Sequence, residues 1–284
     1  MRIKVNDAEL FFDVEGAGLV PDGDRMRTRP TLILLHGGPG ADHSIYKPAF
    51  SELADIAQVI YLDHRGNGRS GGQDPTRWNL AQWGDDVREF CETLGIERPV
   101  VLGTSFGGFV AQAYATRHPA HAGALMLIST AARVDFEVIF QAFSDIGGPE
   151  VEAAARGYWM SPTSESRKRY REICLPLYTT RRAAPDWVRR AIIKDDVALW
   201  FNGPGNEMGQ MDFRTDLAAV TCPVLILSGA QDPMTPPVFH DEIAESLCNA
   251  DVRCKKFEGA GHGVIPDQPD AAFTDIRDFL GTLA

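Results

Sequence analysis

Short apolar segments alternate with amphipathic stretches over the first 130 residues of the chain. The apolar segments have the length of buried strands and cover residues 31–35, 58–62, 99–103 and 124–129. Helical spacing of apolar positions lies between them, at residues 43–55, 79–94 and 105–118. Strands that alternate with helices are typical of a mostly parallel sheet with helices on both faces. The pattern therefore predicts fold class α/β.

The two ends of the chain extend this sheet. Two alternating runs, Arg2–Val5 and Glu9–Glu15, flank the turn residues Asn6 and Asp7 and predict an antiparallel hairpin. Residues 16–30 are rich in glycine, proline and charged side chains and predict an exposed loop. Strand pattern returns late in the chain and is followed by a last helix, at residues 223–227, 253–257 and 270–283.

Residues 131–215 break the alternation of strands and helices. They hold helical stretches with many aromatic and basic residues but no apolar run typical of a buried strand. We therefore expect a core domain formed by residues 1–130 and 216–284, with residues 131–215 inserted as a helical cap, or lid. Six large apolar side chains of this insertion are candidates for lining a pocket or for packing on the core: Trp159, Trp187, Trp200, Phe201, Met208 and Met211.

The composition excludes several classes of partner. The chain of 284 residues has a formal net charge of -11, whereas a nucleic-acid interface needs clustered Lys and Arg that neutralise phosphates. Since no apolar run approaches the length of a membrane span and the first residues lack a secretory pattern, we expect a cytoplasmic protein without membrane contact. Five scattered cysteines without CxxC spacing predict free thiols.

The strongest chemical signal is the segment Gly103-Thr104-Ser105-Phe106-Gly107, which follows a strand pattern and opens a helical one. The spacing G-x-S-x-G between strand and helix predicts a nucleophile elbow, in which a strained turn exposes the serine hydroxyl. A second match occurs at Ser70, between Gly68 and Gly72. No helix pattern follows Ser70, so Ser105 is the predicted nucleophile.

The loop around Ser70 also resembles a dinucleotide-binding fingerprint, since residues 66–71 fit G-x-G-x-x-G and Asp86 lies twenty positions after Gly66. A fingerprint of this kind needs its last glycine inside a starting helix and its acid at the end of the next strand. Neither condition holds, and we predict no NAD or other cofactor.

A nucleophilic serine requires donors for the oxyanion and a general base. The segment His36-Gly37-Gly38-Pro39-Gly40 directly follows the first central strand, where a backbone N–H can point at the developing negative charge. We expect the N–H groups of Gly38 and Phe106 to be the donors. A turn in which the glycines serve only geometry is the alternative.

Chain order selects the base and its partner. His262 lies in the glycine-rich segment 259–263 after a late strand, and Asp232 follows the strand before it. Elbow hydrolases carry Ser, Asp and His in this order. Asp135, which follows an earlier strand, is the rival for the acid. The other six histidines show no spacing typical of a metal site, so no metal is expected.

Together, the HGGPG segment, the residues 63–70, the elbow, the Asp232-Pro233 corner and the GAGHG segment resemble the α/β-hydrolase superfamily, and HGGPG most resembles its proline iminopeptidase branch. The resemblance covers residues 1–130 and 216–284. It implies that Ser105 attacks an acyl carbonyl, that His262 transfers the proton, and that water hydrolyses an acyl-enzyme.

One feature departs from the iminopeptidase branch, which binds a free amine with acidic residues from the cap and from beside the catalytic aspartate. Here Pro233 follows Asp232, so no acidic residue stands directly beside this aspartate. Glu207 is then the remaining candidate in the cap for an acidic residue that binds the amine. We therefore predict a serine hydrolase that cleaves an ester or lactone of a small molecule, with a proline iminopeptidase acting on short peptides as the alternative. Carbon-carbon bond hydrolysis, perhydrolysis and a ligand receptor on the same fold are further alternatives, and the sequence leaves the oligomeric state open.

Overall fold

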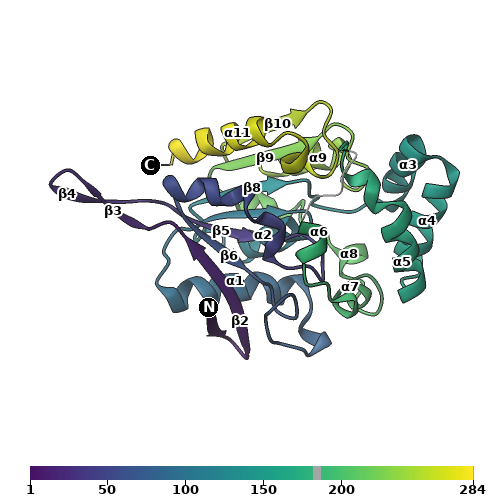
Figure 1. Ribbon diagram of the computed structural model, residues 1–284, viewed down its shortest axis with the longest axis horizontal. Helices are drawn as coiled ribbons and strands as arrows, with labels where there is room; N and C mark the ends of the chain where they lie inside the picture. Colours follow the sequence, from purple (N-terminus) through teal and green to yellow (C-terminus); the bar gives the residue numbers. More distant parts are fainter. Residues whose placement is uncertain (182–186, 284) are drawn as a thin grey trace.

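The computed structural model describes residues 1–181 and 187–283, without the side chains of Trp187 and Val188 (Figure 1). An eight-stranded sheet has the strand order β1-β2-β6-β5-β7-β8-β9-β10. The first two strands are antiparallel, and the pairs from β6 to β10 are parallel. The predicted fold class α/β, with an N-terminal hairpin and a mostly parallel sheet, is therefore confirmed.

The strands run in chain order from β1 to β10: Arg2–Val5, Ala8–Glu15, Leu19–Asp22, Arg25–Thr28, Thr31–Leu35, Gln58–Leu62, Val100–Thr104, Ala124–Ile128, Val224–Gly229 and Val252–Phe257. The α-helices run from α1 to α11: Leu80–Leu94, Phe106–Arg117, Phe136–Gly147, Pro149–Met160, Ser164–Ile173, Trp187–Arg190, Asp195–Asn202, Glu207–Gln210, Pro237–Ser246, Val264–Asp267 and Pro269–Gly281. The 3-10 helices run from η1 to η5: His43–Tyr46, Ala49–Asp55, Pro75–Arg77, Leu175–Tyr178 and Asp216–Ala219.

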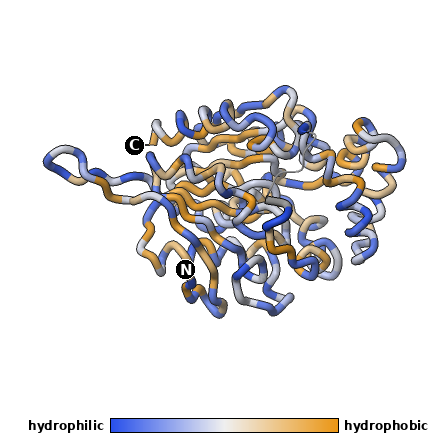
Figure 2. The backbone as a smooth tube through the Cα atoms, viewed as in Figure 1, coloured by the Kyte–Doolittle hydropathy of each residue, from blue (hydrophilic) through white to orange (hydrophobic). Residues whose placement is uncertain are grey.

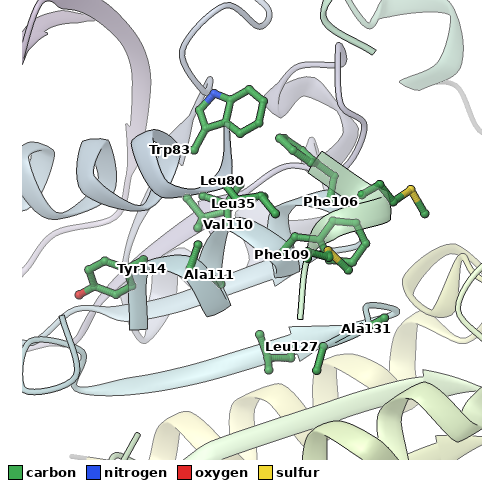
Figure 3. Packing of buried hydrophobic residues seen from close by; sticks show 14 of the residues in the cluster. Leu35, Leu80, Trp83, Phe106, Phe109, Val110, Ala111, Tyr114, Leu127 and Ala131 are labelled. Atoms are coloured by element: carbon green, nitrogen blue, oxygen red, sulfur yellow. The ribbon is translucent and has the colours of Figure 1, made fainter. Parts of the chain in front are cut away.

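The sheet separates two hydrophobic cores. Alternate residues of β5 point to opposite sides, so that Ile33 and Leu35 pack in one core while Leu32 and Leu34 pack in the other. Helices α1 and α2 cover the first core, where Trp83, Phe106 and Val110 meet β5 and β8 (Figure 3). Helices η2 and α11 cover the second core, through residues such as Phe50 and Phe273. Both faces of the strands are buried, which explains their continuous apolar runs.

Two elements differ from the sequence-based prediction. Residues 16–30 hold the hairpin β3–β4, which projects away from the sheet at the left of Figure 1 and carries mostly hydrophilic residues in Figure 2. The predicted helix over 43–55 is instead two 3-10 helices, η1 and η2. Pro48 lies between them, and a proline both lacks an N–H donor and disfavours helical backbone at the preceding residue.

The chain between β8 and β9 carries six α-helices, α3 to α8, in its described part. Helices α3, α4 and α5 pack together at the right of Figure 1, opposite the β3–β4 hairpin. The two ends of this segment meet, since Phe213 N–H donates to Ala132 O at 2.9 Å and Arg133 forms a bridge with Asp212. Within the described ranges, no helix is both long and apolar enough to cross a membrane.

Candidate active site

Ser105 occupies the junction between β7 and α2 in a strained backbone conformation. Its φ of 55° and ψ of -119° lie outside the regions that non-glycine residues usually adopt. Ser105 N–H donates to Ile128 O at 2.9 Å, and the Thr130 hydroxyl donates to Ser105 O at 2.9 Å. Ser105 therefore lies in a strained turn between a strand and a helix, the backbone geometry that the elbow prediction requires, and the neighbouring strand β8 accepts its N–H.

The glycines of the elbow permit a close approach of α2 to the sheet. A Cβ on Gly107 would lie 1.8 Å from Leu35 O, and one on Gly103 would lie 2.2 Å from Gly107 O. No side chain fits at either position, so the spacing G-x-S-x-G follows from packing as well as from the turn itself. The same contacts place the start of α2 directly against the end of β5, where the HGGPG segment begins.

Asp232 and His262 form a buried pair on the loops that follow β9 and β10. His262 Nδ1 lies 2.8 Å from Asp232 Oδ2 and 3.0 Å from Oδ1. Asp232 also accepts hydrogen bonds from the N–H groups of Met234 and Thr235 and from the Thr235 hydroxyl, at 2.6 to 2.8 Å. Burial alone would raise the pKa of Asp232, but the charge of His262 and these hydrogen bonds lower it. The carboxylate is therefore ionised at neutral pH.

The HGGPG segment is held by hydrogen bonds from both sides. Gly40 N–H donates to Asn67 Oδ1 at 2.6 Å, and Lys194 N–H donates to Gly40 O at 2.7 Å. His36 lies between Gly37 O, 2.7 Å from its Nδ1, and His64 N–H, 3.2 Å from its Nε2. Burial lowers the pKa of His36, so the ring is neutral and donates from Nδ1.

The second G-x-S-x-G serine and the acid of the dinucleotide-like pattern both have structural contacts. Ser70 Oγ donates to Asp63 O at 2.6 Å and accepts from Phe11 N–H at 2.9 Å. Asp86 binds the Arg65 guanidinium through two hydrogen bonds of 2.7 and 2.8 Å. The loop that they stabilise also supplies Asn67 and thereby supports the HGGPG segment.

A cavity of about 860 Å³ is lined by three of the five predicted site residues. Ser105, His262 and Gly38 line it from the sheet side, and residues of the 131–215 segment line it from the other side. Phe106 is buried beside it, as the first residue of α2, whose N–H has no acceptor within the helix. The hydrogen bonds of the described residues include none between Ser105 Oγ and His262, a contact that is often long in unliganded enzymes.

Two carboxylates that the sequence offered as candidates serve helix ends. Asp135 caps α3 by accepting from Glu137 N–H at 3.1 Å. Glu207 accepts from Leu80 N–H at 2.8 Å, at the first residue of α1, and it does not line the cavity. Neither contacts His262.

Two residues of the site were missed by the sequence-based analysis. Thr235 orients Asp232, and its position three residues after an aspartate in a turn is a signal for this bond. Tyr178 packs its ring edge-on against His262 with centroids 4.7 Å apart, and its carbonyl accepts from Gly263 N–H. It lies in η4, eighty-four residues before His262, and no local pattern predicts the contact.

The six apolar candidates of residues 131–215 differ in their contact with the cavity. Trp159, Phe201 and Met208 line it, whereas Trp200 and Met211 do not, and the Trp187 side chain lies outside the described residues.

The fold and the site define a class of protein, and the comparison with known families names it. The sequence profile of the alpha/beta hydrolase fold matches residues 30–269. The chain therefore belongs to the α/β-hydrolase family and is a hydrolase, as its resemblance to that superfamily implied.

Relatives of this chain are similar along nearly their whole lengths. A Caulobacter sp. (strain K31) protein assigned as the carbamate hydrolase RutD is 26% identical over 282 residues, which cover 95% of both chains. The proline iminopeptidase PfmaB of Pestalotiopsis fici is 28% identical over 280 residues, which cover 95% of this chain and 98% of PfmaB. A thermophilic esterase from Thermogutta terrifontis has a similar structure, with a TM-score of 0.73 and 25% identity over 100% of this chain and 99% of its own. The likeness to proline iminopeptidases is thus confirmed.

Proposed function

We propose that the chain is a serine hydrolase that cleaves an ester or lactone bond of a small molecule, with Ser105 as nucleophile, His262 as general base and Asp232 as its orienting acid. One observation carries the proposal. A serine in a strained elbow and a histidine bonded to a buried, ionised aspartate line one cavity. This set of groups suits nucleophilic attack on an acyl carbonyl.

In the proposed reaction, Ser105 Oγ attacks the acyl carbon while His262 Nε2 accepts the hydroxyl proton. The N–H groups of Gly38 and Phe106 donate to the oxyanion of the tetrahedral intermediate. His262 then returns the proton to the leaving alkoxide, which departs as an alcohol and leaves an ester on Ser105. A water molecule, deprotonated by His262, hydrolyses this ester and restores the serine.

The electrostatics of the buried pair support this assignment. Asp232 is saturated with hydrogen bonds and keeps its charge, so it stabilises the imidazolium that forms when His262 accepts a proton. It also fixes the tautomer, since an ionised carboxylate only accepts and His262 Nδ1 must donate to it. The Nε2 atom is then left unprotonated for Ser105.

The cavity lining favours an acyl substrate over a peptide with a free amine. A protonated amine requires a nearby carboxylate, and among the described residues that line the cavity there is no Asp or Glu. Glu207 is bound to the start of α1 instead. One relative is named a proline iminopeptidase, while a structural relative is named an esterase, so amide cleavage is the alternative to test.

We further propose that residues 131–215 form a cap over a core of residues 1–130 and 216–284. The ends of the insertion are joined at Ala132 and Phe213, and Tyr158 and Phe201 from its helices line the cavity that Ser105 and His262 reach from the core. A cap of this kind excludes water from the acyl-enzyme and selects the acyl group.

The proposal is tested with purified protein on p-nitrophenyl esters of short and medium acids and on prolyl p-nitroanilide. We expect ester turnover, and we expect Ser105→Ala to lower kcat by about four to six orders of magnitude. The matched control is Ser70→Ala, which changes the other G-x-S-x-G serine and should retain most of the turnover. Efficient cleavage of the anilide with little ester turnover would replace the ester proposal by the aminopeptidase alternative, and substantial ester turnover by Ser105→Ala would refute the nucleophile.

A further inference from the structure

In the described part of the chain, the charged side chains that line the cavity are all basic, although the chain has a net charge of -11. Five cationic side chains line the cavity among the described residues, and no acidic one does: Lys47, Arg167, Arg171, Arg181 and Arg190. An acidic protein as a whole tends to repel anions. Positive charge that is concentrated in its active-site cavity therefore indicates a negatively charged ligand.

Two of these cations are bound by groups outside the cavity. The Lys47 ammonium pairs with Asp13 and Glu15. Arg190 donates to the backbone carbonyls of Ser44 and Lys47 and thereby fixes α6 against η1. These contacts account for both side chains as structural groups at one end of the cavity.

Arg167 and Arg171 are not neutralised in this way. They lie one turn apart on α5 and share a single carboxylate, because Asp195 is 2.7 Å from Arg167 Nε and 3.8 Å from an Arg171 Nη. Two guanidinium groups against one carboxylate leave a net positive charge beside the cavity. Like charges four residues apart destabilise a helix, so this arrangement costs stability that a bound anion would return.

The Tyr158 hydroxyl, beside Arg167, is a hydrogen-bond donor without an acceptor in the described part of the chain. The Tyr158 hydroxyl oxygen accepts from Arg167 Nη1 and from Asn202 Nδ2, each at 3.0 Å. Its own proton therefore has no acceptor among the described residues. Buried donors are normally satisfied, and an oxygen-rich ligand in the cavity would satisfy this hydroxyl.

This end of the cavity is continuous with the reacting groups. Phe201, which precedes Asn202, packs edge-on against Phe106 with ring centroids 5.3 Å apart. On the other side, the Tyr178 ring contacts His262, and the Tyr178 hydroxyl bonds that of Tyr170 at 2.6 Å. Tyr170 in turn packs on Tyr158, with centroids 5.1 Å apart. Apolar side chains such as Met208 and Met234 complete the lining between them.

We infer that the substrate of this hydrolase is an anionic ester or lactone, whose acyl chain carries a carboxylate that Arg167 and Arg171 bind while Ser105 attacks the other end. The inference rests on the proposed function and specifies its substrate class. An ionised carboxylate accepts the guanidinium and tyrosine donors together, and charge-assisted bonds to arginine are among the strongest that a protein forms. The apolar lining holds the methylene groups between the two ends.

The test compares two esters of equal chain length, mono-p-nitrophenyl glutarate and p-nitrophenyl pentanoate. We expect wild type to have the higher kcat/KM for the glutarate ester, mainly through a lower KM, and we expect salt to weaken this preference. Arg171→Gln should lower the ratio of the two kcat/KM values about tenfold, and Arg171→Glu should lower it further. The matched control is Arg169→Gln on the same helix, which pairs with Glu150 outside the cavity and should leave the ratio unchanged.

A binding measurement separates this inference from the proposed chemistry. In Ser105→Ala, glutarate should bind detectably by calorimetry where pentanoate does not, and Arg171→Gln in that background should weaken glutarate binding about tenfold. Two outcomes would overturn the inference of an anionic substrate and leave the proposed esterase activity intact. One is turnover of the pentanoate ester at Ser105 without a preference for the glutarate ester. The other is an equal response of both esters to Arg171→Gln. Loss of ester turnover altogether, with selective glutarate binding retained, would overturn only the proposed chemistry.

Discussion

The backbone of Ser105 is held in a conformation that costs free energy, of order 1–3 kcal/mol for a residue of this kind. The surrounding contacts compensate for it: strand β8 accepts its N–H, Thr130 donates to its carbonyl, and Gly107 allows α2 to approach β5. Strain that is supported from several directions is typical of catalytic residues. At the scale of single residues, the site is thus positioned by neighbours that do not themselves react.

His240 is a buried histidine whose ring accepts a structural hydrogen bond from the backbone next to β8. Its Nε2 accepts from Thr130 N–H at 3.2 Å, and burial lowers the pKa of its ring to about 4. The unfolded chain binds this proton near pH 6.5, whereas the native state binds it only near pH 4. The free energy of unfolding therefore falls as the pH is lowered from 6.5 to 4.

Replacement of this histidine should remove that part of the pH dependence. When the pH is lowered from 7 to 5, we predict that the free energy of unfolding falls by about 2 kcal/mol less in His240→Gln than in wild type. Urea unfolding at the two pH values measures the difference, and Glu245→Gln, which changes an exposed residue on the same helix, serves as control. An equal loss in wild type and His240→Gln would contradict a neutral buried His240.

Glu207 tests the distinction between a helix cap and an amine-binding group. Its carboxylate accepts from the first N–H of α1, a position where negative charge also interacts favourably with the helix dipole. We predict that Glu207→Ala lowers the free energy of unfolding by about 1 kcal/mol, while kcat/KM for esters changes less than about twofold. Urea unfolding and ester kinetics measure the two effects. A large loss of turnover without a loss of stability would instead place Glu207 at the substrate.

At the scale of elements, local pattern predicted most of the sheet domain. The strands and helices from Thr31 to Ile128 follow from apolar runs and helical spacing, because both faces of β5 to β8 are buried. The two 3-10 helices around Pro48 and the exposed β3–β4 hairpin were not predicted. The hairpin buries no periodic face, whereas residues 43–55, whose apolar spacing predicted one helix, are divided at Pro48 into two 3-10 helices.

The junction of β7 and α2 depends on close backbone contact at one glycine. A Cβ at position 107 would overlap Leu35 O, so we predict that Gly107→Ala lowers the free energy of unfolding by about 3 kcal/mol or more. The control is Gly157→Ala on α4, where a Cβ meets no atom within 4 Å and should raise that free energy by about 0.5–1 kcal/mol. Denaturant unfolding of both variants measures the contrast. Tolerance of alanine at position 107 would show that the packing at the elbow is loose.

At the scale of the whole molecule, the site is assembled from distant segments, and only part of it could be predicted from sequence. Ser105, Asp232 and His262 were predicted from the sequence because each follows a strand of the sheet, and the parallel topology brings these strand ends to one edge. Tyr178 and Arg167 were not found as site residues. Their contacts depend on how the helices between β8 and β9 pack over that edge, and no periodicity in the sequence specifies that packing.

Ser105 is the proposed nucleophile of this hydrolase. The most direct test of this proposal is reaction of the intact protein with a fluorophosphonate, followed by peptide mapping with mass spectrometry. We predict a single adduct on Ser105, which Ser105→Ala abolishes and Ser70→Ala retains. An adduct that persists in Ser105→Ala, or that maps to another residue of the wild-type protein, would contradict the account.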